Sequence, residues 1–285
     1  MKTNYFFVSY GDELYSEQRE RIAKEARTTG VFDDVKVFAP EDLPEGLKKK
    51  PIFQGRKDVY KRGGGYWCWK PFVILEVLKV ASDGDVVVYA DSGSIVRKTF
   101  AWHIFFFLMK FCDAIFVEIG GKIKNWTRSS IKNYLARRLL LSWWNVYQFM
   151  ATPTFWKKTP ATIAFLEEWC RLVCDPNLVG DVAEKDLPFE DKEFIENRHD
   201  QAIMSALVYA KPHLEQFKSW VIPNMFEQKM YFGQIVFCAR KSNDSQRSKN
   251  DFENPIMTCL RLLNRTIRWV CNRMICIWGR KREKF

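Results

Sequence analysis

The sequence predicts an α/β fold, with a central sheet covered by helices on both faces, and three observations support this class. The chain of 285 residues is long enough for one large domain with a full hydrophobic core. Hydrophobic residues make up 47% and charged residues 28%, proportions that exclude a disordered or fibrous chain. Short runs rich in β-branched and aromatic residues alternate with segments of helical periodicity, which is the pattern of α/β sheets.

The predicted strands are short and apolar, and the segments between them are long enough for crossover helices. These strands cover residues 5–10, 35–39, 85–91, 114–119 and 234–239. Residues 100–119 form the most apolar stretch, but charged and polar side chains interrupt it. We therefore expect a helix that runs into a buried strand at this point, and no transmembrane segment.

Three helices are predicted from periodicity and end signals. Residues 13–29 form a polar, exposed pattern that ends at Gly30. Pro71 suits the first turn of a second helix, because its missing N–H is not needed there. Residues 160–174 place their apolar side chains on one stripe, as a helix against a core requires.

The composition changes near the C-terminus. We expect a catalytic domain over residues 1–240, a polar linker over residues 241–255 and a basic amphipathic helix over residues 256–285. Apolar residues recur in the last segment at alternating spacings of four and three, at Ile256, Leu260, Leu263, Ile267, Val270, Met274 and Ile277. Most of the net charge of +11 lies in this tail, and a basic chain favours an anionic partner.

The eight cysteines form no C-x-x-C pair and no cluster with histidine at zinc spacing, so a structural zinc is not expected. Buried free thiols indicate a reducing compartment. The N-terminal residues do not have the pattern of a secretory signal. We therefore expect a cytoplasmic protein, with peripheral attachment to the cytoplasmic membrane face through the tail.

Three polar clusters are candidates for chemistry. Asp91 ends an apolar strand, where α/β sheets bind ligands, although an Asp before a Gly is often only a turn. Residues 62–71 combine three glycines, three aromatic rings and Lys70, a set that suits phosphates, bases and sugars, although part of it must pack in the core. Residues 196–201 are polar and precede an apolar helix, where a simple helix cap is the alternative.

In order, the segments FVSYGD, GYWCWKP, GDVVVYADSG, YQFMA with KKTPATIAFLEEW, and ENRHDQAIMSALV resemble a family of GT-A-like glycosyltransferases. These enzymes occur in bacterial surface-polysaccharide pathways and in large DNA viruses. The resemblance covers roughly residues 4–210. It implies a single Rossmann-like domain of the GT-A type with a mixed, mostly parallel sheet, and a hexosyl- or deoxyhexosyltransferase activity.

The resemblance also implies a nucleotide-diphosphate sugar as the donor. The expected donor-binding residues are Ser9, Tyr10, Gly11, Tyr66, Trp69, Lys70, Asp91, Ser92 and Gly93. Asp91 takes the first position of the D-x-D motif, which holds Mn²⁺ or Mg²⁺ on the donor diphosphate in such enzymes. Gly93 stands at the second acidic position, and a single carboxylate makes a weak metal site.

The RHDQ segment resembles the part of these enzymes that lines the donor sugar and the acceptor. Asp200 is the expected general base or oxocarbenium stabiliser, His199 a contact for the metal or the diphosphate, and Gln201 a further catalytic residue. The acceptor is expected to be a hydroxyl of a glycan, lipid-linked or protein-linked molecule.

Two alternative functions stay open, and the tail has three alternative partners. A sugar-nucleotide-binding protein without activity would also fit the missing second carboxylate. A nucleic-acid-binding protein would use the basic tail, but the aromatic residues lie elsewhere, so nucleic acid is not an expected partner. The tail itself, residues 256–285, suits an anionic membrane surface, packing against the domain or pairing with a second copy.

Overall fold

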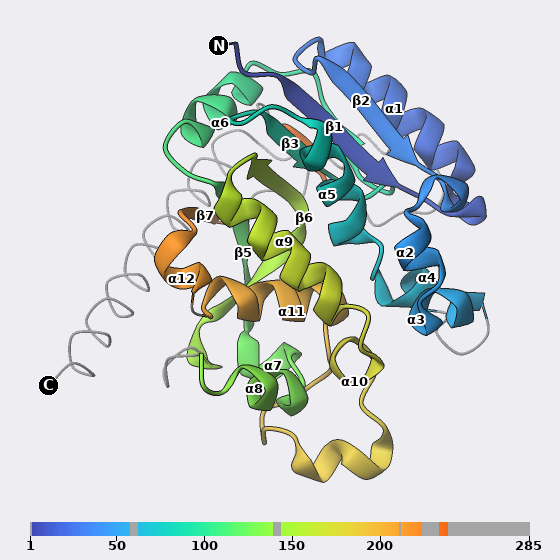
Figure 1. The fold of residues 1–285 in the computed structure, drawn as a ribbon, viewed down its shortest axis with the longest axis vertical. Coiled ribbons are helices and arrows are strands. Elements are labelled where there is room, and N and C mark those ends of the chain that lie inside the picture. The colour runs from blue at the N-terminus through green and yellow to red at the C-terminus, as the bar shows by residue number, and fades with distance from the viewer. Residues whose placement is uncertain (1, 58–61, 139–143, 211, 224–233, 239–285) are drawn as a thin grey trace, which may run out of the picture.

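The computed structural model describes residues 2–57, 62–138, 144–210, 212–223 and 234–238, so the predicted linker and tail lie outside the described residues. A six-stranded sheet forms the centre (Figure 1), built from β1 (Tyr5–Tyr10), β2 (Asp34–Phe38), β3 (Val86–Tyr89), β5 (Ala114–Lys122), β6 (Tyr147–Lys157) and β7 (Ser219–Pro223). The strand order is β2-β1-β3-β6-β5-β7.

The sheet is mixed and mostly parallel. Strand β6 is antiparallel to both of its neighbours, β3 and β5, whereas β1 pairs in parallel with β2 and β3, and β5 with β7. The predicted α/β class with a mixed, mostly parallel sheet is confirmed.

Helices cover both faces of this sheet (Figure 1). Helices α5 (Lys70–Val80), α9 (Pro160–Leu172) and α11 (His199–Val208) share one core with side chains such as Val8 and Trp156. Helices α1 (Ser16–Thr29) and α6 (Ala101–Met109) share the second core with Phe7 and Phe155. Successive strand residues enter opposite cores because side chains alternate across a strand.

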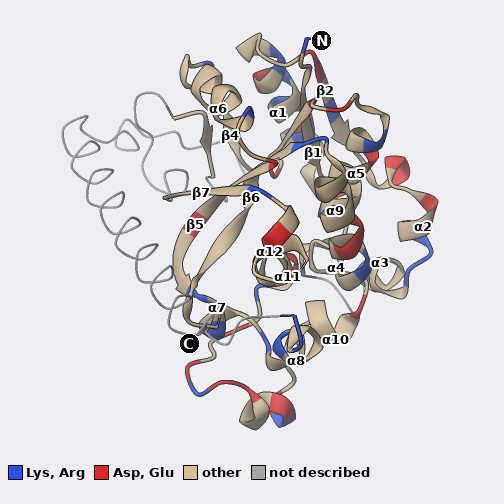
Figure 2. Cartoon of the chain, turned by 60° about the vertical axis from the view of Figure 1, so that its left-hand side comes forward, with Lys and Arg blue, Asp and Glu red and all other residues tan. Residues whose placement is uncertain are grey.

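The shorter elements connect this frame. They are η1 (Glu13–Tyr15), η2 (Pro40–Asp42), α2 (Glu45–Lys48), α3 (Pro51–Gln54), η3 (Gly55–Lys57), α4 (Gly63–Tyr66), β4 (Ile95–Val96), α7 (Ile123–Trp126), α8 (Ser129–Leu135), α10 (Pro176–Val179), η5 (Glu184–Phe189), α12 (His213–Gln216) and β8 (Val236–Phe237). Charged residues lie mainly on helices and loops, and the strands carry few (Figure 2).

The helix ends follow their local signals. Gly30 ends α1 with a φ of 72°, and its N–H donates to the carbonyl of Arg27 at 3.1 Å. Thr159 caps α9 by accepting from the N–H of Thr162 at 3.2 Å, and Pro160 follows at the first helical position. The predicted helices at these two places are confirmed.

One predicted strand is placed wrongly, and three strands escaped prediction, the two-residue β4 and the longer β6 and β7. Residues 236–237 form β8, which pairs with β4 in a separate two-stranded sheet and does not extend the central one. Strand β6 contains Pro153 and a mixture of polar and aromatic residues, and the short β7 is bounded by no turn signal. Their positions depend on distant partners, which a local pattern does not contain.

The five described cysteines, at 68, 112, 170, 174 and 238, are free thiols. The apolar stretch 100–119 forms α6 and then the buried start of β5, as predicted. None of the helices in the described residues is long and apolar enough to cross a membrane.

Glu168 joins three segments on one side of the molecule. Its carboxylate in α9 accepts from Nη2 of Arg138 at 2.9 Å and lies 2.8 Å from Nε2 of His213 in α12. Burial opposes ionisation of this carboxyl group, but the hydrogen bonds from His213 and Arg138 outweigh burial and lower its pKa to about 2. The ionised group therefore stabilises the fold.

We expect Glu168→Gln to lower the free energy of unfolding at pH 7 by about 1–2 kcal/mol, less than the full shift because solvent screens part of the pairing. The folded-state pKa is below the unfolded value, so the difference between wild type and variant is present above pH 4.5 and disappears as the pH falls toward about 2. Urea denaturation across this range measures it. The neighbouring Glu167→Gln is the control, and an equal effect of both changes would contradict the assignment.

Candidate active site

A pocket of about 570 Å³ lies at the carboxyl ends of β1 and β3. These strands are parallel neighbours, and the chain leaves them in opposite directions, to β2 on one side and to the rest of the sheet on the other. Such a switch point is where open α/β sheets bind ligands. Ten of the predicted site residues line the pocket, namely Tyr10, Gly11, Trp69, Lys70, Asp91, Ser92, Gly93, His199, Asp200 and Gln201.

Two predicted donor-binding residues do not line it. Ser9 is fully buried within β1. The ring of Tyr66 packs behind the pocket wall, and its hydroxyl donates to Oδ2 of Asp181 at 2.9 Å. Direct contact of these two residues with a donor remains a prediction, and their geometry gives them a supporting position.

The centre of the site is a buried group of three charges, Asp91, Lys70 and Asp200, which we call the carboxylate–lysine triad. Nζ of Lys70 lies 3.2 Å from Oδ1 of Asp91 and 3.2 Å from Oδ2 of Asp200. The side chains of Lys70 and Asp200 are 4% and 5% exposed, whereas that of Asp91 is 33% exposed toward the pocket. The triad joins α5, the end of β3 and α11.

Local contacts hold the Asp91 end of the triad in place. The hydroxyl of Tyr89 donates to Oδ1 of Asp91 at 2.6 Å, and the Asp91 N–H donates to Oγ1 of Thr152 in β6 at 2.9 Å. The guanidinium of Arg21 in α1 donates to the carbonyl oxygens of Ser92 and Ser94. The loop after β3 is therefore fixed from both sides.

The protonation states follow from burial and mutual charge. Burial opposes the charged form of Lys70, but Asp200 and Asp91 raise its pKa, so it stays a cation. Burial also raises the pKa of Asp200 to about 6, with Lys70 acting against this rise and Asp91 adding to it. At neutral pH Asp200 is mainly ionised, yet it takes up a proton more readily than an ordinary aspartate.

The glycine-rich segment forms an unusual turn beside the triad. All five residues from 63 to 67 have positive φ, between 56° and 95°. The N–H of Tyr66 donates to the carbonyl of Arg62 at 2.8 Å, and that of Trp67 to Gly63 at 3.0 Å, so the segment is one turn of left-handed helix. L-residues are strained in this conformation, and glycine removes that cost at three of the five positions.

Tyr66 and Trp67 are the two strained members of this turn, and both pack on a third strained residue. His199, the first residue of α11, has a φ of 53°. Its ring stacks on Tyr66 at 4.7 Å between centroids and lies 5.5 Å from that of Trp67. In the residues the structure describes, these three are the only non-glycine positions with positive φ. Such strain gathers at functional sites, because the surrounding structure must be built to hold it.

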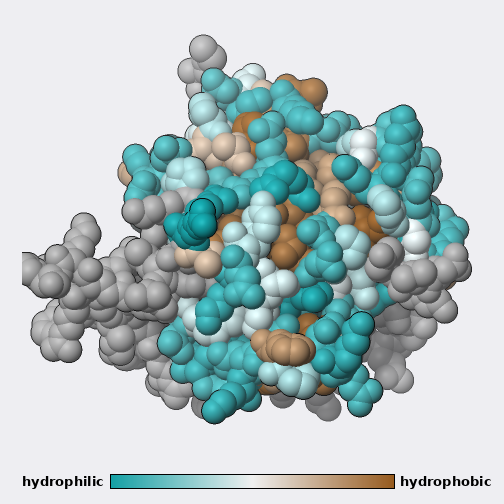
Figure 3. Space-filling view, turned by 60° about the horizontal axis from the view of Figure 1, so that its bottom comes forward, coloured by the Kyte–Doolittle hydropathy of each residue, from teal (hydrophilic) through white to brown (hydrophobic). Residues whose placement is uncertain are grey.

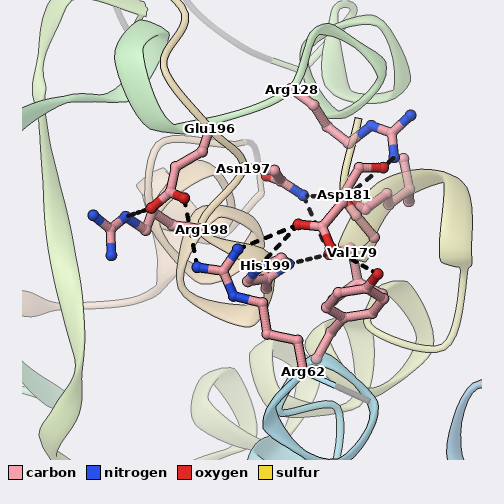
Figure 4. Close-up of polar contacts among 11 residues, drawn as sticks. Arg62, Arg128, Val179, Asp181, Glu196, Asn197, Arg198 and His199 are labelled. Carbon is pink, nitrogen blue, oxygen red and sulfur yellow. Dashed lines mark hydrogen bonds and ion pairs between the residues drawn. The ribbon is translucent and has the colours of Figure 1, made fainter. Parts of the chain in front are cut away.

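A polar wall continues from this turn (Figure 4). Arg62 lies 3.4 Å from Oδ1 of Asp181 and 3.5 Å from Oε2 of Glu196. Nε of Arg198 lies 3.0 Å from Oε1 of Glu196, and its guanidinium lies over the ring of Trp126 at 4.3 Å. Arg62 and Arg198 both line the pocket, so this wall brings two cations to its rim.

The ring of His199 is enclosed. Nδ1 lies 2.8 Å from the carbonyl oxygen of Val179, and Nε2 lies 3.7 Å from Oδ1 of Asp181. Burial lowers the pKa of His199, so the neutral ring donates from Nδ1 to Val179 at pH 7. The position of His199 suits support of the pocket wall, and its predicted metal contact stays a prediction.

Of the two predicted metal ligands, Asp91 presents its carboxylate to the pocket, whereas the ring of His199 is enclosed. These residues contain no group of three His, Cys, Asp or Glu side chains placed to hold a metal. Asp91 has one oxygen engaged by Tyr89 and Lys70, which leaves Oδ2 and the pocket side of the carboxylate. One carboxylate suits Mg²⁺ or Mn²⁺ only where phosphate oxygens and water complete the shell.

Several lining residues were missed by the sequence analysis. Asp12 and Tyr15 follow β1, Arg62 precedes the glycines, and Thr152 lies in the unpredicted strand β6. The polar character of Asp12 directly after a strand was a usable signal. No local sequence signal identified Thr152, because its role depends on β6 lying beside β3.

No protein-family model matches the chain, and no curated protein matches it. The solved structures similar to it include 4-diphosphocytidyl-2C-methyl-D-erythritol synthase from Anaerococcus prevotii, at 11% identity over 92% of this chain and 99% of that one, with a TM-score of 0.37. The WbbM bifunctional glycosyltransferase has 11% identity over 93% and 45%, with a TM-score of 0.44. The galactosyltransferase LgtC with donor and acceptor sugar analogues has 13% identity over 78% and 75%, with a TM-score of 0.36. The α/β class of the chain rests on its own strand order.

We expect Gly65→Ala to destabilise the chain by about 1–3 kcal/mol more than Gly84→Ala does. Both glycines have positive φ, 95° and 88°. A Cβ at residue 65 would lie 2.8 Å from the carbonyl oxygen of Ile52, whereas one at residue 84 meets nothing within 4 Å. Because both positions share the cost of positive φ, urea denaturation of the two variants isolates the steric part, and equal losses would contradict the close packing of Gly65 on Ile52.

Lys70→Met is expected to cost about 3–5 kcal/mol of unfolding free energy at pH 8, because it leaves the buried carboxylate of Asp200 and the partly exposed one of Asp91 without their cation. The loss should shrink toward pH 5, since Asp200 can then take up a proton. Lys79→Met on the same helix is the control, as Lys79 is half exposed and pairs only with Glu76. A similar small effect of both changes would show that Lys70 is not essential to the site.

Proposed function

We propose that the chain is a glycosyltransferase that moves a hexosyl or deoxyhexosyl group from a nucleotide-diphosphate donor to an acceptor hydroxyl. The observation that carries this proposal is the carboxylate–lysine triad at the carboxyl end of β3, inside a pocket at the switch point of the sheet. It combines a base of raised pKa with a fixed cation, the two kinds of group that glycosyl transfer needs.

The donor fits the size and the walls of the pocket. A volume of about 570 Å³ lies in the range of sites for cofactors and nucleotides. Trp69 packs on Tyr10 at 4.1 Å between ring centroids, and both rings border the cavity with Trp67. Aromatic faces bind bases and sugars well, because both offer flat apolar surfaces.

The nucleotide is proposed to lie at the end of β1. A side chain at Gly11 would place its Cβ 2.8 Å from Cβ of Tyr15, so the backbone here approaches its neighbours closely. Gly11 and the small side chain of Ser92 therefore form a tight edge beside the ring of Tyr10. The diphosphate would follow toward Lys70, with Arg62 and Arg198 at the rim to balance its charge.

In the proposed reaction Asp200 removes the proton of the acceptor hydroxyl. The acceptor oxygen forms a bond to the anomeric carbon, and the bond from that carbon to the diphosphate breaks, with its electron pair leaving on the nucleoside diphosphate. Lys70 keeps Asp200 ionised and oriented while this happens. Gln201 donates to Oε1 of Gln148 at 2.9 Å and so completes the floor beside Asp200.

A divalent cation, where the enzyme uses one, would be held by Asp91 and would neutralise charge on the leaving diphosphate. His199, buried against Tyr66 and Trp67, is proposed to hold the wall between Asp200 and the glycine-rich turn. Ser9 and Tyr66 take supporting positions behind the donor. The proposed acceptor is a glycan or a lipid-linked hydroxyl of surface-polysaccharide synthesis.

Release of nucleoside diphosphate from UDP-, GDP- and dTDP-sugars, with and without acceptor, tests the proposal on the full chain. Wild type should release nucleoside diphosphate with at least one donor, and Asp200→Asn should be slower by about a hundredfold or more. Binding of a donor without release would support the inactive sugar-nucleotide-binding protein instead. Glu184→Gln, a change at an exposed acid that does not line the pocket, is the control.

The rate should also depend on pH in a defined direction. Asp200 acts as a base only when ionised, and burial raises its pKa to about 6. We therefore expect kcat/KM to fall about tenfold for each pH unit below about 6, with a plateau above it. The residual rate of Asp200→Asn should lack this acid limb, and an unchanged limb in the variant would assign the base to another residue.

A further inference from the structure

Helix α6 has two apolar faces, and only one of them is used by the core. Trp102, Phe105, Phe106 and Met109 are buried against the sheet. On the opposite side four large apolar residues are exposed by 77%, 52%, 55% and 56%, namely Phe100, Ile104, Phe107 and Phe111, which we call the outer face of α6. Ile104 and Phe107 lie on α6, Phe100 directly precedes it and Phe111 follows its last residue by two, and the spacings of four, three and four continue one helical stripe.

Ring contacts hold both ends of the outer face together. The rings of Phe107 and Phe111 meet edge to face at 5.3 Å between centroids, and Nζ of Lys110 lies 5.8 Å from the centroid of Phe107. The ring of His103 lies 5.3 Å from that of Phe100 at the other end. Contiguous apolar surface of this kind marks a place of interaction, whereas single exposed apolar residues need no explanation.

The charged residues of the segment that carries this face, between Asp91 and Asp113, are all basic. Residues 92–112 contain Arg97, Lys98 and Lys110 and no acidic residue. Exposed aromatic residues flanked by cations are the composition of helices that lie in the plane of an anionic membrane, where the rings enter the headgroup boundary and the cations meet lipid phosphates.

The geometry points to an anionic lipid surface as the occupant: we propose that the outer face of α6 docks the protein on such a membrane. The chain's own tail, residues 256–285, and a second copy of α6 are the other apolar candidates, and both are basic. Each would place positive charge next to Arg97, Lys98 and Lys110, which repel it. An anionic membrane is the partner that complements both the apolar stripe and its cations.

The path of the chain adds to this argument. Strand β8 pairs with β4, which lies just before α6, and the N–H of Arg97 donates to the carbonyl of Ile235 at 2.9 Å. The last described segment, residues 234–238, therefore lies beside the residues that lead into α6. The tail that the sequence predicts, residues 256–285, is also basic and apolar, and two weak contacts with one surface strengthen each other.

A second exposed apolar group provides an internal comparison. Leu187, Phe189 and Ile195 are exposed by 47%, 79% and 62%, but residues 181–196 carry seven acidic side chains against two lysines. The end of the molecule that carries this segment is mostly hydrophilic, with its apolar residues in separate patches (Figure 3). Anionic lipid should repel it, so apolar exposure alone does not predict binding there.

Co-sedimentation of the full chain with vesicles of phosphatidylcholine alone, or mixed with phosphatidylglycerol, tests the inference. Wild type should bind the mixed vesicles, and binding should weaken with salt. The double substitution Ile104→Ser with Phe107→Ser should weaken binding by about tenfold or more, because two large apolar side chains lose their lipid contact. Both sites are on the surface, and unchanged thermal unfolding confirms that the fold is kept.

Leu187→Ser with Phe189→Ser is the matched control, since it removes two exposed apolar side chains from the acidic segment, and it should bind like wild type. Lys110→Gln should lower binding to the mixed vesicles and leave binding to vesicles of phosphatidylcholine alone unchanged. The inference is overturned if wild type does not bind the mixed vesicles, or if the double variant binds them as wild type does. A change of the double variant from dimer to monomer in light scattering, with vesicle binding unaltered, would assign the face to a second copy. The outcome is independent of the proposed transfer activity.

Discussion

The buried cation of Lys70 is the constraint on which the site depends. An ammonium group enclosed at 4% exposure requires anionic partners, and Asp91 and Asp200 provide them from parts of the chain far apart in sequence. To bring these three residues together, α5, the end of β3 and the start of α11 must all converge on one edge of the sheet. The same contact that completes the core thus creates a pair of carboxylates with unequal environments, one facing the pocket and one enclosed.

The unequal environments explain the division of roles that we propose. Asp91 is partly exposed and tied to Tyr89 and Thr152, which suits charge stabilisation at the donor. Asp200 is enclosed and has a raised pKa, which suits transfer of a proton. The left-handed turn and the strained backbone of His199 close the wall beside them, so the least relaxed backbone in the described chain lies next to the most strongly coupled charges.

The parts that could be predicted are those set by local signals. Gly30 and the Thr159-Pro160 pair end or begin helices through their own backbone bonds, and the apolar runs of β1, β3 and β5 are visible in any short window. Strand β6 escaped prediction because its place between β3 and β5 depends on non-local pairing. The motifs identified Lys70, Asp91 and Asp200 separately, but only the fold brings them within ion-pair distance. The apolar outer face of α6 was not predicted for a similar reason. In a helix that is apolar all round, the sequence pattern does not indicate which side packs against the core.

The central claim is that the pocket beside the triad binds a nucleotide-diphosphate sugar. A thermal-shift titration of the full chain with UDP-, GDP- and dTDP-sugars, with and without Mn²⁺, measures this most directly, because a ligand that binds only the folded state raises its apparent stability. The account predicts that at least one donor raises the unfolding temperature of wild type and that Asp91→Asn weakens this response. A panel in which no donor shifts the transition, with or without the cation, would contradict it.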